Sequence, residues 1–171
     1  SNWKHAEMRI LLMDENSQIG GAQVVLIQLA GHLHSRGVLT GALIQGPGRL
    51  EQQLLESEAA IEYYDFQGLK KRWFLPWVLR SNNRSILAAI ERFRPDVILC
   101  NSPWTAVCAA SAIRIRNVRS VAVVHANVEP KRAIKKITMP FIMRRTVPVF
   151  RNWVAVSEAL CRQVHAMGAA H

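Results

Sequence analysis

The sequence predicts an α/β domain in which helices cover both faces of a parallel β-sheet. Six short runs rich in valine, isoleucine and leucine alternate with segments whose apolar residues recur every three or four positions. Strands that are apolar on both faces are typical of parallel sheets buried on both sides. Because helices separate the strands, the expected architecture is a doubly wound, Rossmann-like sheet of about six strands.

Length and composition are those of a single folded domain. The chain has 171 residues, half of them hydrophobic, which suffices for one buried core. We expect residues 8–171 to form this domain and residues 1–7 to be a tag or a disordered start. No run approaches the ~18 to 20 apolar residues of a membrane span. The N-terminus also lacks the apolar run of a secretory signal.

The three cysteines suit a reducing compartment. Cys100, Cys108 and Cys161 form no CxxC pair, so neither a disulfide framework nor a cysteine metal site is indicated. A cytoplasmic location is therefore expected. The carboxylates are scattered, and no two have the spacing of an acid/base dyad or a metal site. We accordingly expect no metal.

The first half of the chain predicts three strands and two helices. A long helix is expected after Gly20-Gly21 and should end where Gly37 supplies a left-handed stop. It should bury one face, because its apolar residues follow a period of 3.6. These residues are Ala22, Val25, Leu26, Leu29, Ala30 and Leu33. The short helix is expected over residues 50–56, and the strands over residues 8–13, 38–45 and 61–66.

The second half predicts three further strands and several helices. Residues 67–80 mix basic, aromatic and proline residues, and we expect an ordered excursion there rather than a linker. Ser102-Pro103 is typical of a helix start, and Ser157 should cap the last helix. Pro130 should open a basic helical segment that Pro140 breaks or kinks. The expected strands cover residues 96–100, 120–125 and 153–156, and the expected helices residues 81–94, 103–115 and 158–168.

The loops that follow the strands are the places to look for a ligand, because doubly wound sheets bind at the carboxyl ends of their strands. The first of these loops is the most distinctive. Gly20 and Gly21 let the backbone approach a ligand closely, and the helix after them offers unpaired N–H groups and a positive dipole end. This suits a phosphate or a sugar hydroxyl. The alternative is that the two glycines only make a tight turn.

Three familiar motifs fit this sequence poorly. A dinucleotide site, such as an epimerase uses, needs GxGxxG and an acidic residue ending the second strand, and that strand ends here in Gln45-Gly46. A P-loop needs GxxxxGK followed by serine or threonine, which no glycine here provides. A phospho-receiver domain matches Asp14-Glu15 and Asp65, but it needs a lysine where the fifth strand ends in His125.

His125 is the histidine placed to act in the same crevice. It closes the apolar run Val121-Ala122-Val123-Val124, so it stands at the carboxyl end of the fifth strand. A histidine there can be a hydrogen-bond partner or a proton carrier. Packing histidines at strand ends are also common, and the residues alone leave both roles open.

Charge is concentrated in the second part of the chain. Residues 1–65 hold 4 Lys/Arg against 8 Asp/Glu, and residues 66–171 hold 18 against 4. Within residues 131–151 no acidic residue interrupts the basic ones. The basic residues include Lys131, Arg132, Lys135, Lys136, Arg144 and Arg145. Because apolar residues are interleaved, the segment is either a membrane-binding stretch or a helix packed on the sheet. We expect no nucleic acid partner, since no binding motif is visible.

Four runs carry a family pattern in the family's order. They cover residues 9–12 with 19–23 and 29–37, residues 95–98 with 101–102, residues 123–125 and residues 154–160. The first contains Ile19-Gly20-Gly21-Ala22-Gln23, and the last reads Val154-Ala155-Val156-Ser157-Glu158. Together they resemble the N-terminal domain of family 4 glycosyltransferases, which have the two-domain GT-B fold.

The resemblance implies sugar transfer from a nucleotide-diphospho-sugar to a glycan or lipid-linked acceptor, with retained anomeric configuration and without a cofactor or metal. The N-terminal domain of such enzymes mainly binds the acceptor. Gly20 and Gly21 would lie against the donor phosphates, and His125 would face the transferred sugar as the catalytic residue. The residues expected to line the interdomain cleft are Asn101, Ser102 and Ser157.

Two residues depart from the family's usual pattern. Gln23 stands where a glutamate is usual, and Val38 where a histidine follows Arg36-Gly37. We expect neither to touch the mapped site closely. A donor-binding second domain is expected beyond residue 171, so the chain alone should neither hydrolyse nor transfer a donor sugar. The alternative is a stand-alone binding module for a sugar nucleotide or an anionic lipid surface.

Overall fold

The computed structural model describes residues 8–66, 76–125 and 141–168, and of residues 76–83 only the backbone. Three sets of predictions lie outside the described residues. They concern the start of the chain, the part of the excursion over residues 67–80 that covers residues 67–75, and the basic segment from Pro130 to Pro140. The last set includes Lys131, Arg132, Lys135 and Lys136.

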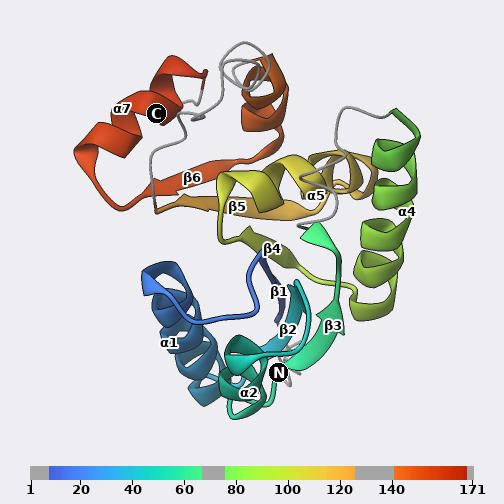
Figure 1. Cartoon of the computed structure of the whole chain (residues 1–171), viewed down its shortest axis with the longest axis vertical. Coiled ribbons are helices and arrows are strands. Elements are labelled where there is room, and N and C mark those ends of the chain that lie inside the picture. The colour runs from blue at the N-terminus through green and yellow to red at the C-terminus, as the bar shows by residue number, and fades with distance from the viewer. Residues whose placement is uncertain (1–7, 67–75, 126–140, 169–171) are drawn as a thin grey trace, which may run out of the picture.

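Six parallel strands form one sheet in the order β3-β2-β1-β4-β5-β6 (Figure 1). The strands are β1 (Arg9–Asp14), β2 (Leu39–Ile44), β3 (Ala60–Tyr63), β4 (Val97–Cys100), β5 (Arg119–Val124) and β6 (Asn152–Ala155). The chain adds β2 and β3 on one side of β1, and then returns to add the other three on the opposite side. The doubly wound sheet predicted from the sequence is thereby confirmed.

Helices cover both faces of the sheet. They are α1 (Gly21–Ser35), α2 (Arg49–Leu55), α4 (Pro76–Phe93), α5 (Pro103–Arg116) and α7 (Glu158–Ala166), with a short 3-10 helix η1 (Val147–Val149). Residues 141–146 are helical as well. The apolar residues of α1 and α2 form one core, and those of α4 and α5 another. α7 packs on Val124 of β5 through Leu160 and Val164.

The central strand β1 shows why both faces are buried. Leu12 belongs to the core shared with α1 and α2, while Leu11 and Met13 belong to the core shared with α4 and α5. Successive residues of a strand point to opposite faces. An all-apolar strand therefore needs a helix layer on each side, which is the arrangement that the sequence predicted.

Two helix ends follow the signals in the sequence. Ser102 caps α5, and its Oγ accepts a hydrogen bond from the Thr105 N–H (3.1 Å). Gly37 follows α1 with a φ of +70°, and the Val38 N–H donates to the Leu33 carbonyl (3.0 Å). Because side chains are strained at this φ, glycine is the residue expected there.

The buried face of α1 differs from the prediction at two positions. Val25 was predicted to be buried and is 49% exposed, whereas the polar Gln23 is only 6% exposed. Leu26 and Ala30 are buried as expected. The helix is turned so that its first turn places Gln23 against the end of β1, where this amide finds polar partners.

Two element boundaries differ from the predictions by three residues or more. The third strand was predicted to run to residue 66 and ends at Tyr63, because Phe66 leaves the sheet to enter the core beneath α5. There the Phe66 carbonyl accepts a hydrogen bond from Trp104 Nε1 (3.1 Å). α4 begins at Pro76 rather than at residue 81, which agrees with the preference of proline for the first helical position.

Candidate functional site

Three strands end together where the strand order reverses. β1 and β4 are neighbours, and β5 lies beside β4. Asp14 is the last residue of β1, Asn101 follows β4, and His125 follows β5. Because the strands are parallel, these residues share one edge of the sheet, and doubly wound sheets bind their ligands at such an edge.

Asp14 lies at the centre of this site and is 1% exposed. Its Oδ2 accepts hydrogen bonds from Asn101 Nδ2 (2.6 Å) and Gln23 Nε2 (3.0 Å). Its Oδ1 accepts from the Asn16 backbone N–H (2.8 Å), and also from Gln23 Nε2 (3.1 Å) and Asn16 Nδ2 (3.2 Å). All of these partners are N–H donors, so the surroundings suit an ionised carboxylate.

Gln23 joins this carboxylate to the glycine loop. It is the third residue of α1, and its Oε1 accepts a hydrogen bond from the Gly20 N–H (3.1 Å). The prediction that Gln23 does not touch the mapped site was wrong. A residue at this helix position reaches back to the N-cap, and here it also reaches the end of β1.

Asn101 joins Asp14 to His125. Its Oδ1 lies 2.9 Å from His125 Nε2, and its Nδ2 donates both to Asp14 and to the Ala22 carbonyl (3.2 Å). The Asn101 side chain is 3% exposed. A continuous hydrogen-bonded chain thus runs from Gly20 to His125 and links residues that the sequence had placed in one crevice.

Burial shifts the pKa of Asp14 and of His125, the two titratable groups among these hydrogen-bonded residues. It raises the pKa of Asp14 above its ordinary value, and the hydrogen bonds from Asn101, Gln23 and Asn16 oppose that rise. Burial lowers the pKa of His125, and the charge of Asp14 opposes that fall. Burial therefore favours the neutral imidazole, which has one N–H donor and one acceptor nitrogen.

The glycine loop is exposed to solvent beside these hydrogen-bonded residues. A Cβ at Gly21 would meet no atom within 4 Å, whereas one at Gly20 would lie 3.1 Å from Gln23 Oε1. The Gly20 N–H is bonded to Gln23. Within the described part of the chain, the N–H groups left for an anion at this helix end are those of Gly21 and Ala22.

The start of α2 holds this loop from the other side. The Leu50 N–H donates to the Ser17 carbonyl (3.1 Å). A Cβ at Gly48 would collide with the same carbonyl, so the close approach of the two segments requires glycine. The loop between β1 and α1 is thus held at Ser17 in its middle and at Gly20 at its end.

The two serines predicted to line a cleft are helix N-caps. Ser102 caps α5 directly after Asn101, and Ser157 caps α7, where its Oγ accepts from the Leu160 N–H (3.4 Å). Ser102 lies at the same sheet edge as His125, while Ser157 follows the outermost strand β6. Their part in lining a cleft stays a prediction.

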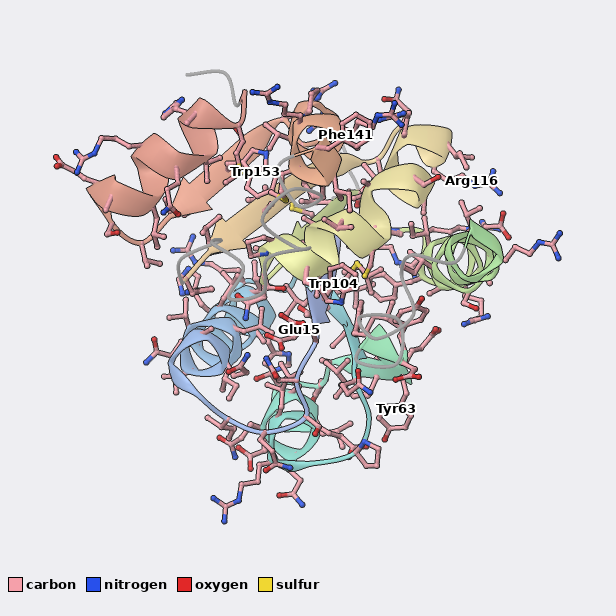
Figure 2. The ribbon with its side chains drawn as sticks, turned by 45° about the horizontal axis from the view of Figure 1, so that its top comes forward. Glu15, Tyr63, Trp104, Arg116, Phe141 and Trp153 are labelled. Carbon is pink, nitrogen blue, oxygen red and sulfur yellow. The ribbon has the colours of Figure 1, made fainter. Side chains whose placement is uncertain are left out.

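Arg144 and Arg145 lie away from this site, near the amino ends of the strands. Arg114, in the last turn of α5, donates from Nη2 to the Arg145 carbonyl (3.3 Å). α5 begins beside Asn101, at the carboxyl edge, and ends before β5 starts at the opposite edge. Figure 2 shows Phe141, close to Arg145 in sequence, well away from Glu15 of the β1–α1 loop.

Asp14 was not predicted as a member of this site and entered the sequence predictions only as part of the acidic loop of a phospho-receiver domain. A signal was present, because Asp14 directly follows an apolar strand at the edge where ligands bind. A carboxylate at the end of a buried strand needs several hydrogen-bond donors, and Asn101 and Gln23 were available to supply them.

A comparison with protein-family models agrees with the fold. The model of Glycosyltransferase Family 4 matches residues 19–171. The chain belongs to this family. No curated protein matches it.

Solved structures share the fold of this member of Glycosyltransferase Family 4. HepE of Anabaena in complex with UDP is 20% identical, with a TM-score of 0.66 over 95% of this chain and 42% of HepE. The lipopolysaccharide outer core galactosyltransferase WaaB is 15% identical, with a TM-score of 0.67 over 95% of this chain and 43% of WaaB. The chain therefore spans about two fifths of the length of these proteins.

The fold alone does not single out one activity. A putative UDP-N-acetylglucosamine 2-epimerase of Listeria monocytogenes is 12% identical, with a TM-score of 0.63 over 96% of this chain and 43% of the epimerase. Among the described residues, none of the helices has the length and apolar character to span a bilayer. The same residues contain no cluster of three or more His, Cys, Asp or Glu that could hold a metal.

Proposed function

We propose that this chain is the acceptor-side, N-terminal domain of a retaining glycosyltransferase. The enzyme takes a hexosyl group from a nucleotide-diphospho-sugar and transfers it to a glycan or lipid-linked acceptor. Family membership supports glycosyl transfer. The observation that carries the proposal is the hydrogen-bonded chain that joins Gly20 to His125, since it sets a neutral histidine beside helix N–H groups suited to phosphate.

The proposed roles follow from the geometry of the hydrogen-bonded residues that join Gly20 to His125. The N–H groups of Gly21 and Ala22 receive a donor phosphate, and His125 faces the transferred sugar through its other ring nitrogen. Asn101 positions His125, and Ser102 and Ser157 line the cleft. The donor is a substrate, and the proposal requires neither a cofactor nor a metal.

The domain needs a second, donor-binding domain in this proposal. Support comes from the length of the solved proteins, since the chain covers only 42% of HepE. HepE was crystallised with UDP, which makes UDP a suitable probe. We expect the 171-residue chain to bind UDP at its glycine loop without releasing UDP from UDP-glucose. Steady UDP release by the isolated chain would contradict the two-domain part of the proposal.

Gly21→Val tests the donor loop, because the added side chain meets no protein atom within 4 Å of its Cβ and occupies only the space beside the loop. In an amide NMR titration with UDP, the parent chain should shift at Gly21 and Ala22. The variant should bind about tenfold more weakly, a change of ~1.4 kcal/mol. Gln28→Val, on the exposed side of the same helix, is the matched control and should bind like the parent.

A second candidate function is binding to an anionic lipid surface at the cytoplasmic face of a membrane. The observation that favours it is an exposed basic and aromatic cluster formed by Arg114, Phe141 and Arg145. Phe141 is 58% exposed, and the Arg145 guanidinium lies 4.5 Å from the centre of its ring. Among the described residues, neither arginine is paired with a carboxylate. Exposed aromatic and basic side chains together suit a lipid headgroup layer.

Vesicle co-sedimentation tests this surface. The chain should bind vesicles containing phosphatidylglycerol and leave vesicles of phosphatidylcholine alone in solution. The double variant Arg144→Glu with Arg145→Glu should lose most of that binding. Arg36→Glu with Arg49→Glu, which changes the net charge equally at exposed positions of the first half, should lose much less. Equal binding to both kinds of vesicle would exclude the electrostatic surface.

A further inference from the structure

The charge of Asp14 fixes the orientation of the amides around it. If Asn101 turned its Oδ1 toward the carboxylate, two acceptors would stand 2.6 Å apart with no proton between them. Gln23 is bound in the same way, because its Nε2 lies within 3.1 Å of both carboxylate oxygens. At 1% exposure, Asp14 has no access to water as a substitute partner.

The orientation of Asn101 in turn decides which nitrogen of His125 carries the proton. With Nδ2 bonded to Asp14, Oδ1 faces His125 Nε2 at 2.9 Å, and a carbonyl oxygen can only accept. The neutral ring must then hold its proton on Nε2. Its Nδ1 keeps a lone pair that can accept a hydrogen bond from a substrate hydroxyl.

The orientation of Gln23 acts on the glycine loop by the same rule. Since Nε2 is bonded to Asp14, Oε1 is the atom that faces the Gly20 N–H at 3.1 Å. This bond holds Gly20 extended, with φ −129° and ψ −172°, and directs the chain into the helix. If the amide were reversed, two donors would face each other and the bond that secures the loop would be lost.

We propose that Asp14 is a positioning residue for this site. Its single negative charge acts through Asn101 to hold the proton of His125 on Nε2, and through Gln23 to hold the glycine loop in its observed form. The reaction that this positioning serves rests on the proposed function. The positioning itself is a property of the unliganded chain, so it can be tested without a substrate.

Asp14→Asn is the decisive variant, because it keeps the shape of the side chain and removes its charge. The new amide oxygen stays with the fixed Asn16 backbone N–H, so the new NH2 group faces Asn101. Asn101 should then turn its amide, give up its bond to the Ala22 carbonyl and donate to His125 Nε2. The ring proton should move to Nδ1, which ¹⁵N NMR reports as an exchange of the protonated and unprotonated nitrogen signals of His125. The pKa of His125 should also fall, since the charge of Asp14 that opposes the effect of burial is gone. A His125→Gln sample identifies the signals.

Asp65→Asn is the matched control. It makes the same chemical change at an exposed carboxylate after β3, where Asp65 accepts a hydrogen bond from Gln45 Nε2 (3.0 Å). The tautomer and pKa of His125 should stay as in the parent chain. If Asp14→Asn leaves the proton on Nε2, or if both variants move it, the proposal is overturned.

Two further variants keep the proposal testable if Asp14→Asn does not fold. Asn101→Leu removes the link to His125 and leaves Gln23 and Asn16 bonded to Asp14, so His125 should show a mixture of tautomers. Gln23→Leu should speed hydrogen exchange at the Gly20 amide and keep the Nε2 tautomer. A pure Nε2 tautomer in Asn101→Leu would contradict the proposal. None of these measurements uses UDP or an acceptor, so failure of the proposed function would show separately.

Discussion

The two edges of the sheet hold their polar side chains in opposite ways. At the carboxyl edge, Asp14, Gln23 and Asn101 are at most 6% exposed and bonded to one another. Near the amino edge, Arg114 and Arg145 are exposed and meet through one hydrogen bond to a backbone carbonyl. Buried polar groups depend on particular partners, whereas exposed charges keep water as a partner. The first edge is therefore sensitive to single substitutions, while the second acts through its total charge.

Among the substitutions that test this contrast, Asp14→Ala is expected to lower the free energy of unfolding most. The substitution leaves buried N–H donors of Gln23 and Asn101 without an acceptor, and each unsatisfied donor costs about 1–3 kcal/mol. We expect the free energy of unfolding, measured with urea, to fall by about 3 kcal/mol. Asp65→Ala removes an exposed carboxylate and should change it by no more than ~0.5 kcal/mol. Equal losses would remove the distinction between buried and exposed carboxylates.

A smaller effect is expected from the helix cap beside the site. Ser102→Ala removes the acceptor of the Thr105 N–H bond (3.1 Å), and such caps contribute about 1 kcal/mol. Ser157→Ala removes a longer bond (3.4 Å) at an exposed position and should cost about 0.5 kcal/mol. Urea unfolding of both variants measures the difference. A larger loss for Ser157→Ala would reverse the expected ranking of the two caps.

Near the amino edge, Arg145→Ala should cost about 0.5 kcal/mol, the size of a cation–π contact at an exposed site. The contact is the one with Phe141, at 4.5 Å from the ring centre. Arg144→Ala is the comparison, since no ring contact of this neighbour is seen among the described residues, and its stability should match the parent. A loss of several kcal/mol in either variant would show that this edge is packed rather than exposed.

The smallest expected effect is a pH dependence from His125. Burial lowers its pKa in the folded chain, so below about pH 6.5, the ordinary value, the unfolded chain binds the proton more readily. The contribution of His125 is thus fully present above that pH and is lost as pH falls toward the lowered pKa. Urea midpoints at about pH 7.5 and 5.5 should converge in His125→Gln. In His34→Gln, at an exposed position of α1, they should differ as in the parent.

The fold was predictable from the sequence because its signals are local. The apolar run of β1 indicates burial on both faces, Gly37 marks the end of α1, and Ser102-Pro103 marks the start of α5. Each of these requires only a few neighbouring residues. The end of β3 was predicted wrongly because it depends on a distant contact. Phe66 leaves the strand to pack in a core that includes Trp104, far along the chain.

The site could be predicted only in part. Gly20 and His125 were placed in one crevice because strand ends meet at one edge, a rule of topology that needs no side-chain detail. Asn101 was named only through the family resemblance. Asp14 and Gln23 were missed because they belong to the site only through their hydrogen bonds to each other and to Asn101. The hydrogen bond between Asp14 and Asn101 joins residues 87 positions apart, and no local sequence pattern predicts it. In addition, Gln23 stands where the family usually has a glutamate, so the family pattern did not predict it as a site residue.

The contact of Gly48 and Leu50 with the Ser17 carbonyl has a kinetic consequence. A loop secured at Ser17 and at Gly20 needs little rearrangement when a ligand arrives, so the ordering cost of binding is small. Ligands that meet such a preformed surface are expected to associate at similar rates. Differences in affinity among nucleotides should then appear in how long each one stays bound.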